Sequence, residues 1–337
     1  MKLIAGDIGG TKTTLALYSS EKGVREPLFE ATYASMSCGS LEDIVSRFIE
    51  DFGIEEVGYA VFGVAGPVIE EKVAVTNLPW VVDKSLIISS IGFKDMHLLN
   101  DLEAMAYSIS HLEEADLLSL NKGVPEPKGP RAIIAPGTGL GEAYLTWDGS
   151  RYVAHPSEGG HTEFGPGDDT EIELLKYLFE RHGHVSYELV CSGMGIPNIY
   201  SFLKDRGYYD EPSWFSERLA RADDKTAVIL GTAVDEKASC AIAKAALRLF
   251  VSVLGAETGN LALKILSTGG VYIGGGIPPR ILPALREGPF IQSFLRKGRL
   301  SRVLHKMPVS VILNPKAGLM GAAVSGFEAF EPAGDKP

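Results

Sequence analysis

Hydrophobic residues near the N-terminus follow the pattern of two short strands joined by a turn. Residues 3–5 form one apolar run, residues 14–18 form another, and Gly9-Gly10 lies between them. Glycine permits the tight backbone that a hairpin needs. The sequence therefore predicts a β-hairpin in this region.

A helical period follows over residues 41–52, where apolar residues recur at intervals of three and four positions. Ser40 can cap the start, and Gly53 marks the end. The same reasoning predicts helices that begin at Asp101 and Ser186, and further helices over 84–91, 170–181, 199–203, 238–266 and 317–330. A break is expected in the longest of them, near Gly255 or Gly259.

Strand-like runs alternate with these helices, which is typical of an α/β architecture with mixed sheets. They lie at 57–64, 73–75, 97–100, 132–135, 143–145, 270–273 and 309–313. The run at 132–135, the turn at Gly137-Thr138-Gly139 and the run at 143–145 repeat the plan of the first hairpin. We interpret this as a weak internal repeat of two half-molecules. The predicted domains are 1–110 plus 316–332, which is the smaller, and 111–315.

Composition narrows the class of protein. The 337 residues are 45% hydrophobic, and the formal net charge is −11. This charge offers no basic surface for nucleic acid or an anionic membrane. The three cysteines, Cys38, Cys191 and Cys240, are too widely spaced for a disulfide framework, so we expect a reducing cytoplasm. The longest apolar segment is interrupted by charges, so no membrane span is expected.

Both glycine turns have the chemistry of phosphate binding. Backbone N–H groups in such a turn can form a nest for phosphate oxygens, and the hydroxyls of Thr11 and Thr13 extend it. Lys12 adds a positive charge, and Asp7 can hold Mg²⁺ directly or through water. A plain hairpin turn is the alternative for either turn alone. The residues expected to contact a polyphosphate are Gly9, Gly10, Thr11, Lys12, Gly137, Thr138 and Gly139, with Gly274 and Gly275 beside a flat ligand such as adenine.

Acidic residues suggest a polyol site. Asp101 follows Asn100 where a strand becomes a helix, so the helix dipole keeps its carboxylate ionised and able to accept a proton from an alcohol. An ordinary helix cap is the alternative. Glu158 and His161 are spaced to bind adjacent hydroxyls, with a metal site as the competing interpretation. Glu188 is a further acid at a predicted helix start.

Taken together, these motifs resemble bacterial-type glucokinases of the sugar kinase, actin and heat-shock ATPase superfamily. The resemblance covers nearly the whole chain, and it rests on the order and spacing of six motifs: Gly6–Thr11, Leu98–Asp101, Gly137–Gly141, Ser157–His161, Gly183–Glu188 and Gly269–Ile277. It implies a two-lobed actin-like ATPase fold, also called ribonuclease H-like, with mixed sheets and a cleft between the lobes. It also implies an ATP- and Mg²⁺-dependent kinase for the 6-hydroxyl of glucose.

The resemblance also assigns roles to residues. It implies that Asp101 is the catalytic base. The residues that would line the glucose site are Asn100, Asp101, Glu158, His161 and Glu188. Lys12 stands where this group tends to have asparagine, as in the related repressor and kinase family. That family usually carries a cysteine-rich zinc motif, and none follows His161, so Mg²⁺ is the only metal expected.

Three other functions compete with a glucokinase. A kinase for another hexose or an amino sugar would share the fold, and a sugar-responsive regulator would bind without catalysis. A chaperone-like or filament-forming ATPase would hydrolyse ATP without a sugar acceptor. The chain starts at Met1, directly before the first predicted strand, which argues against an N-terminal DNA-binding appendage. A homodimer is expected from the resemblance alone.

Overall fold

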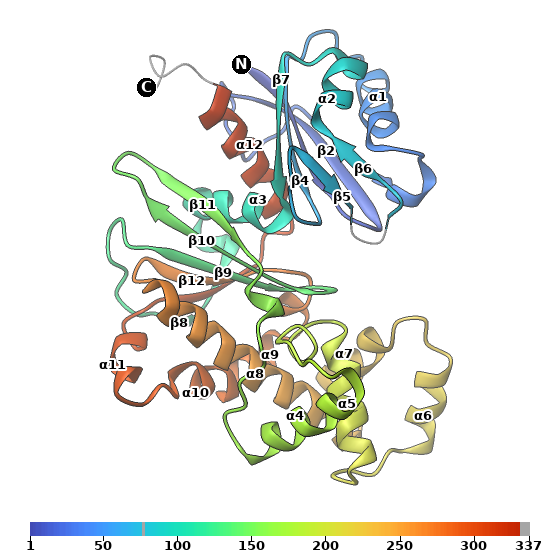
Figure 1. Ribbon diagram of the computed structural model, residues 1–337, viewed down its shortest axis with the longest axis vertical. Helices are drawn as coiled ribbons and strands as arrows, with labels where there is room; N and C mark the ends of the chain where they lie inside the picture. The colour runs from blue at the N-terminus through green and yellow to red at the C-terminus, as the bar shows by residue number, and fades with distance from the viewer. Residues whose placement is uncertain (76–77, 331–337) are drawn as a thin grey trace. The chain divides into compact units, whose positions relative to one another are not determined.

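The computed structural model describes residues 1–75 and 78–330, which form two compact units (Figure 1). The first unit contains Met1–Asp116, Asp148–Pro156 and the chain from Asn314 onward. The second unit contains Leu117–Trp147 and Ser157–Leu313. Each unit combines a mixed sheet with helices, so the predicted α/β class is confirmed.

The sheet of the first unit has the strand order β3-β2-β1-β4-β7. Its strands are β1 (Lys2–Ile8), β2 (Lys12–Ser19), β3 (Phe29–Ala34), β4 (Tyr59–Val64) and β7 (Asp95–Asn100). The first three strands are antiparallel neighbours, which confirms the predicted hairpin. By contrast, β1, β4 and β7 run parallel, so their carboxyl ends lie at one edge of the sheet.

Helices cover both faces of this sheet. They are α1 (Leu41–Asp51), α2 (Lys84–Ile87), α3 (Asp101–Ser108) and α12 (Ala317–Phe330). Because successive strand residues point to opposite faces, Ile4 and Ile8 pack with α1 and α2, whereas Leu3 and Ala5 pack with α3 and α12. Figure 1 shows these two helix layers on either side of the sheet. The central strand β1 is therefore held on both faces.

The helices of the first unit can be compared with those that the sequence predicts. The Ser40 hydroxyl accepts the Asp43 N–H at 3.2 Å, so the predicted cap of α1 is confirmed. The helix predicted over 84–91 is instead α2 followed by a π-helical turn at Ile88–Gly92. Two short strands, β5 (Lys72–Ala74) and β6 (Val81–Asp83), form a separate antiparallel pair.

The sheet of the second unit runs β10-β9-β12-β13-β8. Its strands are β8 (Leu117–Asn121), β9 (Arg131–Pro136), β10 (Leu140–Trp147), β12 (Gly270–Ile273) and β13 (Val309–Ile312). The antiparallel pair of β9 and β10 confirms the second predicted hairpin. A further strand, β11 (Tyr152–Ser157), is divided between the two units: it belongs to the first unit as far as Pro156, and Ser157 belongs to the second.

The helices of this unit pack into one hydrophobic core with the sheet. They are α4 (Asp169–His182), α5 (Gly195–Asp205), α6 (Ser213–Ala220), α7 (Lys225–Val234), α8 (Ala241–Ile265), α9 (Leu282–Arg286), α10 (Pro289–Leu295) and α11 (Ser301–Leu304). The longest, α8, contributes more residues to this core than any other of these helices, including Phe250, Val253 and Leu254, which are fully buried.

Two sequence predictions were wrong here. The expected break in α8 does not occur, because Gly255 and Gly259 let α10 approach closely instead. A Cβ at Gly255 would overlap the Phe290 carbonyl oxygen, and one at Gly259 would lie 2.6 Å from that of Phe294. The helix expected at Ser186 is also absent, because that segment forms consecutive turns.

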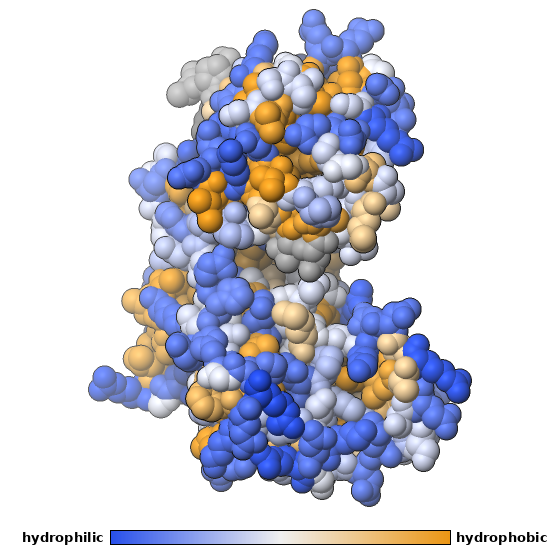
Figure 2. All heavy atoms as spheres, turned by 45° about the vertical axis from the view of Figure 1, so that its right-hand side comes forward, coloured by the Kyte–Doolittle hydropathy of each residue, from blue (hydrophilic) through white to orange (hydrophobic). Residues whose placement is uncertain are grey.

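Figure 2 shows hydrophobic side chains interspersed among hydrophilic ones on the face it presents. Scattered exposed apolar residues are normal for a folded protein. Among the described residues, no helix is both long and apolar enough to cross a membrane.

Candidate functional site

In the first unit, the predicted residues gather where the parallel strands end. Ile8 pairs with Val64, and Val64 with Asn100, so these three residues form one row across the sheet. Asp7 lies one residue before this row and Asp101 one residue after it. Ligands of open α/β sheets commonly bind at the carboxyl ends of the strands. This edge therefore carries the first group of candidate residues.

The turn between β1 and β2 is fixed from outside. The Gly9 N–H donates to the Lys12 carbonyl at 3.0 Å, and the Ser35 hydroxyl donates to the Gly9 carbonyl at 2.8 Å. The Ser35 N–H also donates to the Thr11 carbonyl at 3.0 Å. Ser35 was not predicted as a site residue, since it is far from the turn in the sequence and belongs to no motif.

The two threonines of this turn differ. Thr11 is exposed, together with Lys12 and beside the half-exposed Gly10. Thr13 is fully buried, and its hydroxyl forms a 3.0 Å hydrogen bond with that of Ser35. The expectation that both hydroxyls extend a phosphate nest is therefore wrong for Thr13. The buried Thr13 hydroxyl instead stabilises the turn through its contact with Ser35.

Asp7 is the residue predicted to hold Mg²⁺. Burial raises the pKa of its carboxyl, and the nearby charge of Lys12 opposes that rise. The Asp7 carboxyl forms no hydrogen bond with another described residue. A Cβ at Gly318 would lie 3.5 Å from Asp7 Oδ2, so glycine there keeps space open beside the carboxyl. A carboxylate with open space fits Mg²⁺, which prefers oxygen ligands.

Asn100 and Asp101 form the strand-to-helix junction. The Asn100 Oδ1 atom accepts the Leu102 N–H at 3.0 Å, and its Nδ2 atom donates to the Gly66 carbonyl at 3.1 Å. Asp101 is the first residue of α3 and is exposed. Its Oδ1 atom lies 2.9 Å from the Leu102 nitrogen. The positive end of the helix dipole favours its ionised form.

The second group of predicted residues surrounds the turn between β9 and β10. The Gly137 N–H donates to the Gly139 carbonyl at 2.9 Å, and the Gly193 N–H donates to the Gly137 carbonyl at 2.8 Å. Thr138 is exposed at the tip of the turn. The turn is thus held by the segment that leads into α5.

Gly274 and Gly275 lie beside the same turn. The Gly274 N–H donates to the Ile134 carbonyl at 2.8 Å. Gly275 has a φ of +87°, and a Cβ there would lie 2.5 Å from the Pro136 carbonyl oxygen. Glycine is required here because the backbone is left-handed and crosses the end of β9 closely.

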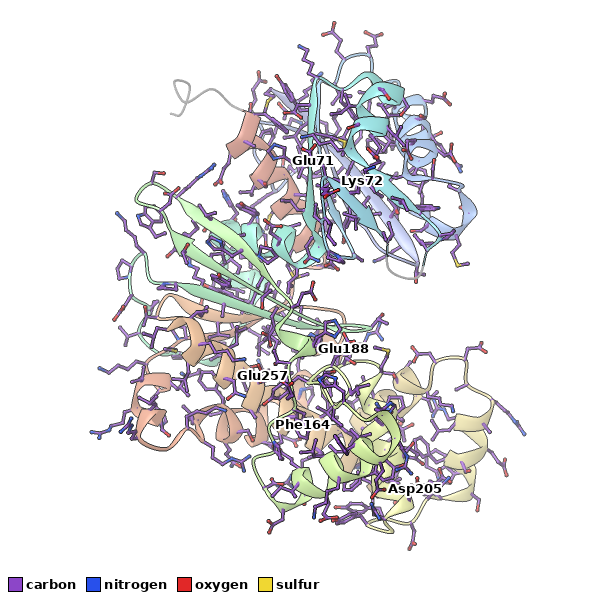
Figure 3. All side chains as sticks on the ribbon, viewed as in Figure 1. Glu71, Lys72, Phe164, Glu188, Asp205 and Glu257 are labelled. Atoms are coloured by element: carbon purple, nitrogen blue, oxygen red, sulfur yellow. The ribbon has the colours of Figure 1, made fainter. Side chains whose placement is uncertain are left out.

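Glu188 links the turn to the predicted sugar-binding residues. Its Oε2 atom accepts the Leu140 N–H at 3.0 Å, and its own N–H donates to the Gly160 carbonyl at 2.9 Å. A Cβ at Gly139 would overlap Glu188 Oε2. Figure 3 shows Glu188 in the second unit, close to the strand ends.

His161 completes this cluster. Its Nε2 atom lies 3.7 Å from Glu158 Oε2, and its Nδ1 atom lies 4.0 Å from Glu188 Oε1. Glu158 and His161 are both well exposed, so their polar atoms are available to a ligand. Among the residues that the structure describes, no group of three or more His, Cys, Asp or Glu side chains could hold a metal ion.

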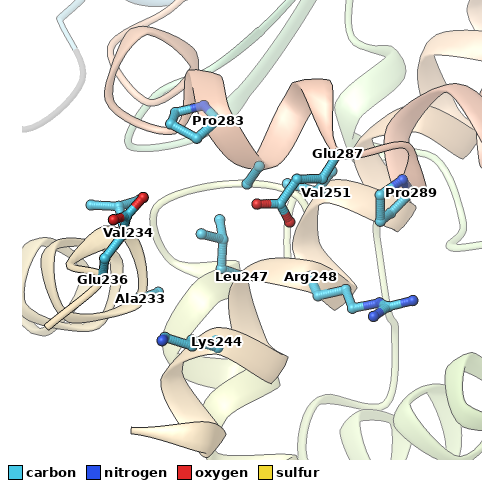
Figure 4. Close-up of a pocket in the computed structure, with 11 residues that line it drawn as sticks. Ala233, Val234, Glu236, Lys244, Leu247, Arg248, Val251, Pro283, Glu287 and Pro289 are labelled. Carbon is cyan, nitrogen blue, oxygen red and sulfur yellow. The ribbon is translucent and has the colours of Figure 1, made fainter. Parts of the chain in front are cut away.

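A pocket of about 230 Å³ lies elsewhere in the second unit, between α7, α8 and α9 (Figure 4). Its lining combines apolar residues, such as Leu247, with four charged residues: Glu236, Lys244, Arg248 and Glu287. None of the predicted site residues lines this pocket, so it is no candidate for their chemistry.

Comparisons with known proteins agree on one family. A family model described as Glucokinase matches residues 4–328. The chain is 40% identical over 336 residues to the glucokinase of Nostoc punctiforme, which covers 96% of this chain and 98% of that protein.

Solved structures extend the comparison. A glucokinase from an Antarctic psychrotroph is 28% identical, with a TM-score of 0.81 over 97% of this chain and 99% of that chain. A ROK family glucokinase from Streptomyces griseus, solved with glucose and AMPPNP, has a TM-score of 0.64 at 20% identity, over 97% of this chain and all of that one. The predicted actin-like ATPase fold is thereby confirmed.

Proposed function

Because the chain belongs to the glucokinase family, we propose that it is an ATP-dependent kinase that phosphorylates the 6-hydroxyl of glucose. The family match over residues 4–328 is the observation that carries this proposal. The Streptomyces griseus relative, solved with glucose and an ATP analogue, supports the choice of both substrates.

Asp101 is proposed as the catalytic base. It is exposed at the start of α3, where the helix dipole stabilises its negative charge. An ionised carboxylate can accept the proton of the sugar hydroxyl as that oxygen attacks the γ-phosphorus. Asn100 fixes the junction through its bonds to Leu102 and Gly66, which limits the positions that Asp101 can adopt.

The remaining residues are proposed to bind the two substrates. Glucose hydroxyls would be held by Asn100, Glu158, His161 and Glu188, whose carboxylates and imidazole can accept and donate hydrogen bonds. ATP phosphates would be held by backbone N–H groups of the two turns, with Lys12 as a point charge. The residues proposed to contact ATP are Gly9, Gly10, Thr11, Lys12, Gly137, Thr138, Gly139, Gly274 and Gly275.

Asp7 is proposed to hold Mg²⁺, directly or through water. A divalent cation at this carboxylate would neutralise charge on the phosphates. It would also offset the burial that raises the pKa of Asp7, so the carboxyl would stay ionised.

The test is a coupled assay of ADP formation with a panel of hexoses and amino sugars. Glucose-dependent ADP release, with little release in the absence of sugar, is the expected result. Faster turnover with another sugar would identify that sugar, and not glucose, as the substrate. ADP release that does not depend on sugar would contradict the assignment as a hexose kinase. Asp101→Asn serves as the matched inactive variant.

Three further assignments stay predictions. Three free cysteines suit a reducing cytoplasm. The net charge of −11 argues against nucleic acid as a partner. A homodimer is expected from the family resemblance, and light scattering of the purified protein would measure it.

A further inference from the structure

Two carboxyl groups that no predicted role uses lie together in the second unit. Glu142 on β10 is 2% exposed, and Glu257 on α8 is fully buried. The charge of Glu257, and a hydrogen bond to it, are among the causes that raise the pKa of the buried Glu142 carboxyl. An acid that is buried beside another carboxyl group resists ionisation, so Glu142 keeps its proton.

Glu142 lies directly beneath the predicted sugar-binding turn at Gly159–His161. Leu140 and Glu142 are two residues apart on β10 and share one face. A Cβ at Gly160 would overlap the Leu140 carbonyl oxygen, and one at Gly159 would overlap Glu142 Oε2. The backbone of the turn therefore rests on these two residues.

Leu140 also connects this contact to Glu188. Its N–H donates to Glu188 Oε2 at 3.0 Å. The Glu188 N–H in turn donates to the Gly160 carbonyl at 2.9 Å. A shift of Glu142 would therefore move the turn that carries Glu158 and His161. Glu188 would move less, because the Leu140 N–H also holds its side chain.

The groups around the pair leave it short of positive charge. Lys264 on α8 lies 3.3 Å from Glu257 Oε1, and Asn260 donates to Glu257 Oε2 at 2.8 Å. Lys297 is directed to the Ala256 carbonyl, at 2.9 Å, and to Asn260. From the turns that precede α5, the Tyr187 hydroxyl faces Glu257, and the Cys191 thiol faces both acids. Figure 3 shows Glu257 in the same region of the unit as Glu188.

The protonation state follows from this environment. Burial, followed by the charge of Glu257, raises the pKa of Glu142 to about 8, and Lys264 opposes the rise. The Glu142 Oε1 atom is buried and receives no hydrogen bond from the described residues. A proton on the Glu142 carboxyl removes the cost of burying an unpaired charge there.

We propose that Glu142 is a positioning residue for hexose binding, whose buried, protonated carboxyl keeps the Gly159–His161 turn in place for the sugar. This inference rests on the proposed function of Glu158 and His161. Release of the proton to solvent at alkaline pH leaves two negative charges side by side. Their repulsion displaces Glu142 against the turn and weakens glucose binding more than the chemical step.

The first test compares pH profiles of wild type and Glu142→Gln, whose neutral amide cannot titrate. In wild type, KM for glucose should rise about tenfold between pH 7 and pH 9.5, with kcat changed less than about twofold. In the variant, this rise should be absent. Glu171→Gln is the matched control, because Glu171 is equally buried in this unit but bonds to Gly167 and Ser252 instead. An equal rise in Glu142→Gln would overturn the proposal.

The second test needs no sugar, so it separates this inference from the assignment of glucose. Amide hydrogen exchange over residues 157–164 is compared between wild type and Glu142→Gln at the same pH. The two should agree at pH 6.5, and wild type should exchange several-fold faster at pH 9. Equal rates at pH 9 would overturn the proposal. Glu257→Gln neutralises the other member of the pair and serves if Glu142→Gln does not fold.

Discussion

The turn that joins β1 to β2 and the turn that joins β9 to β10 follow one sequence plan, yet different neighbours hold them. Ser35, just beyond the adjacent strand β3, bonds to Gly9 and Thr11 in the first turn. The second is held by Gly193, at the approach to α5, and is followed at Leu140 by the contact with Glu188. Equal motifs can therefore be supported by unrelated parts of a fold.

The charges beside the two turns differ as well. The first turn has Lys12 within it and Asp7 before it, a combination suited to phosphate and a cation. The second turn contains no charged side chain but contacts Glu188, which we propose to bind sugar. We infer that the first turn serves phosphate and its cation, while the second connects phosphate and sugar binding.

The largest effect should arise in the first unit, at Asp101. Asp101→Asn removes the proposed base but keeps the size of the side chain. We expect kcat to fall by about 10²–10⁴-fold, because a general base contributes about that much. KM for glucose should change far less. Steady-state kinetics would measure both, and a kcat close to wild type would remove Asp101 from the mechanism.

A substitution in the second turn should mainly affect sugar binding. Gly139→Ala adds a Cβ that overlaps Glu188 Oε2 and displaces it from the Leu140 N–H. We expect KM for glucose to rise about 10- to 100-fold, as for the loss of one buried charged hydrogen bond. Gly137→Ala is the control, since its Cβ would meet no atom within 4 Å. Equal effects of both substitutions would show that Glu188 is not the cause.

The carboxyl pair predicts a pH dependence of stability that belongs to the second unit. The pKa of Glu142 is raised from 4.5 to about 8, so between these values the folded protein keeps a proton that the unfolded chain has released. The stability that this proton adds is fully present below pH 4.5 and is lost as the pH rises through 8. Wild type should therefore lose stability relative to Glu142→Gln, by on the order of 4 kcal/mol between pH 5 and pH 9.

Urea unfolding of both proteins at pH 5 and pH 9 measures this difference. Glu173→Gln is the surface control, because the Glu173 side chain on α4 is 43% exposed and pairs with Lys176. If the urea midpoint changes equally in wild type and in Glu142→Gln between pH 5 and pH 9, Glu142 does not hold a proton in the folded protein.

The smallest effect is expected for the support of the first turn. Ser35→Ala removes the hydrogen bonds to the Gly9 carbonyl and to the Thr13 hydroxyl. We expect the protein to lose about 1–2 kcal/mol of unfolding free energy, and KM for ATP to rise a few-fold. Ser37→Ala, at an exposed neighbour, should change stability by less than about 0.5 kcal/mol. Thermal unfolding and ATP titrations would compare the two.

Much of the local structure was predictable from the sequence. Both hairpins and the strand-to-helix junction at Asn100 formed as predicted. The helix over 317–330 has the predicted bounds. Gly255 and Gly259 were misread, because a glycine in a helix can mark either a break or a close approach of another helix. Only the position of α10 distinguishes the two.

The features of the candidate site can likewise be separated into those that the sequence predicted and those that only the tertiary structure showed. Sequence alone determined the turns, the capping residues and the acid at the start of α3, because each depends on neighbours within a few positions of the chain. Tertiary structure alone decided that Ser35 fixes the first turn, that Thr13 is buried, and that Glu142 meets Glu257 beneath Gly159. These contacts join distant residues, and the burial that sets their energies exists only after the chain has folded.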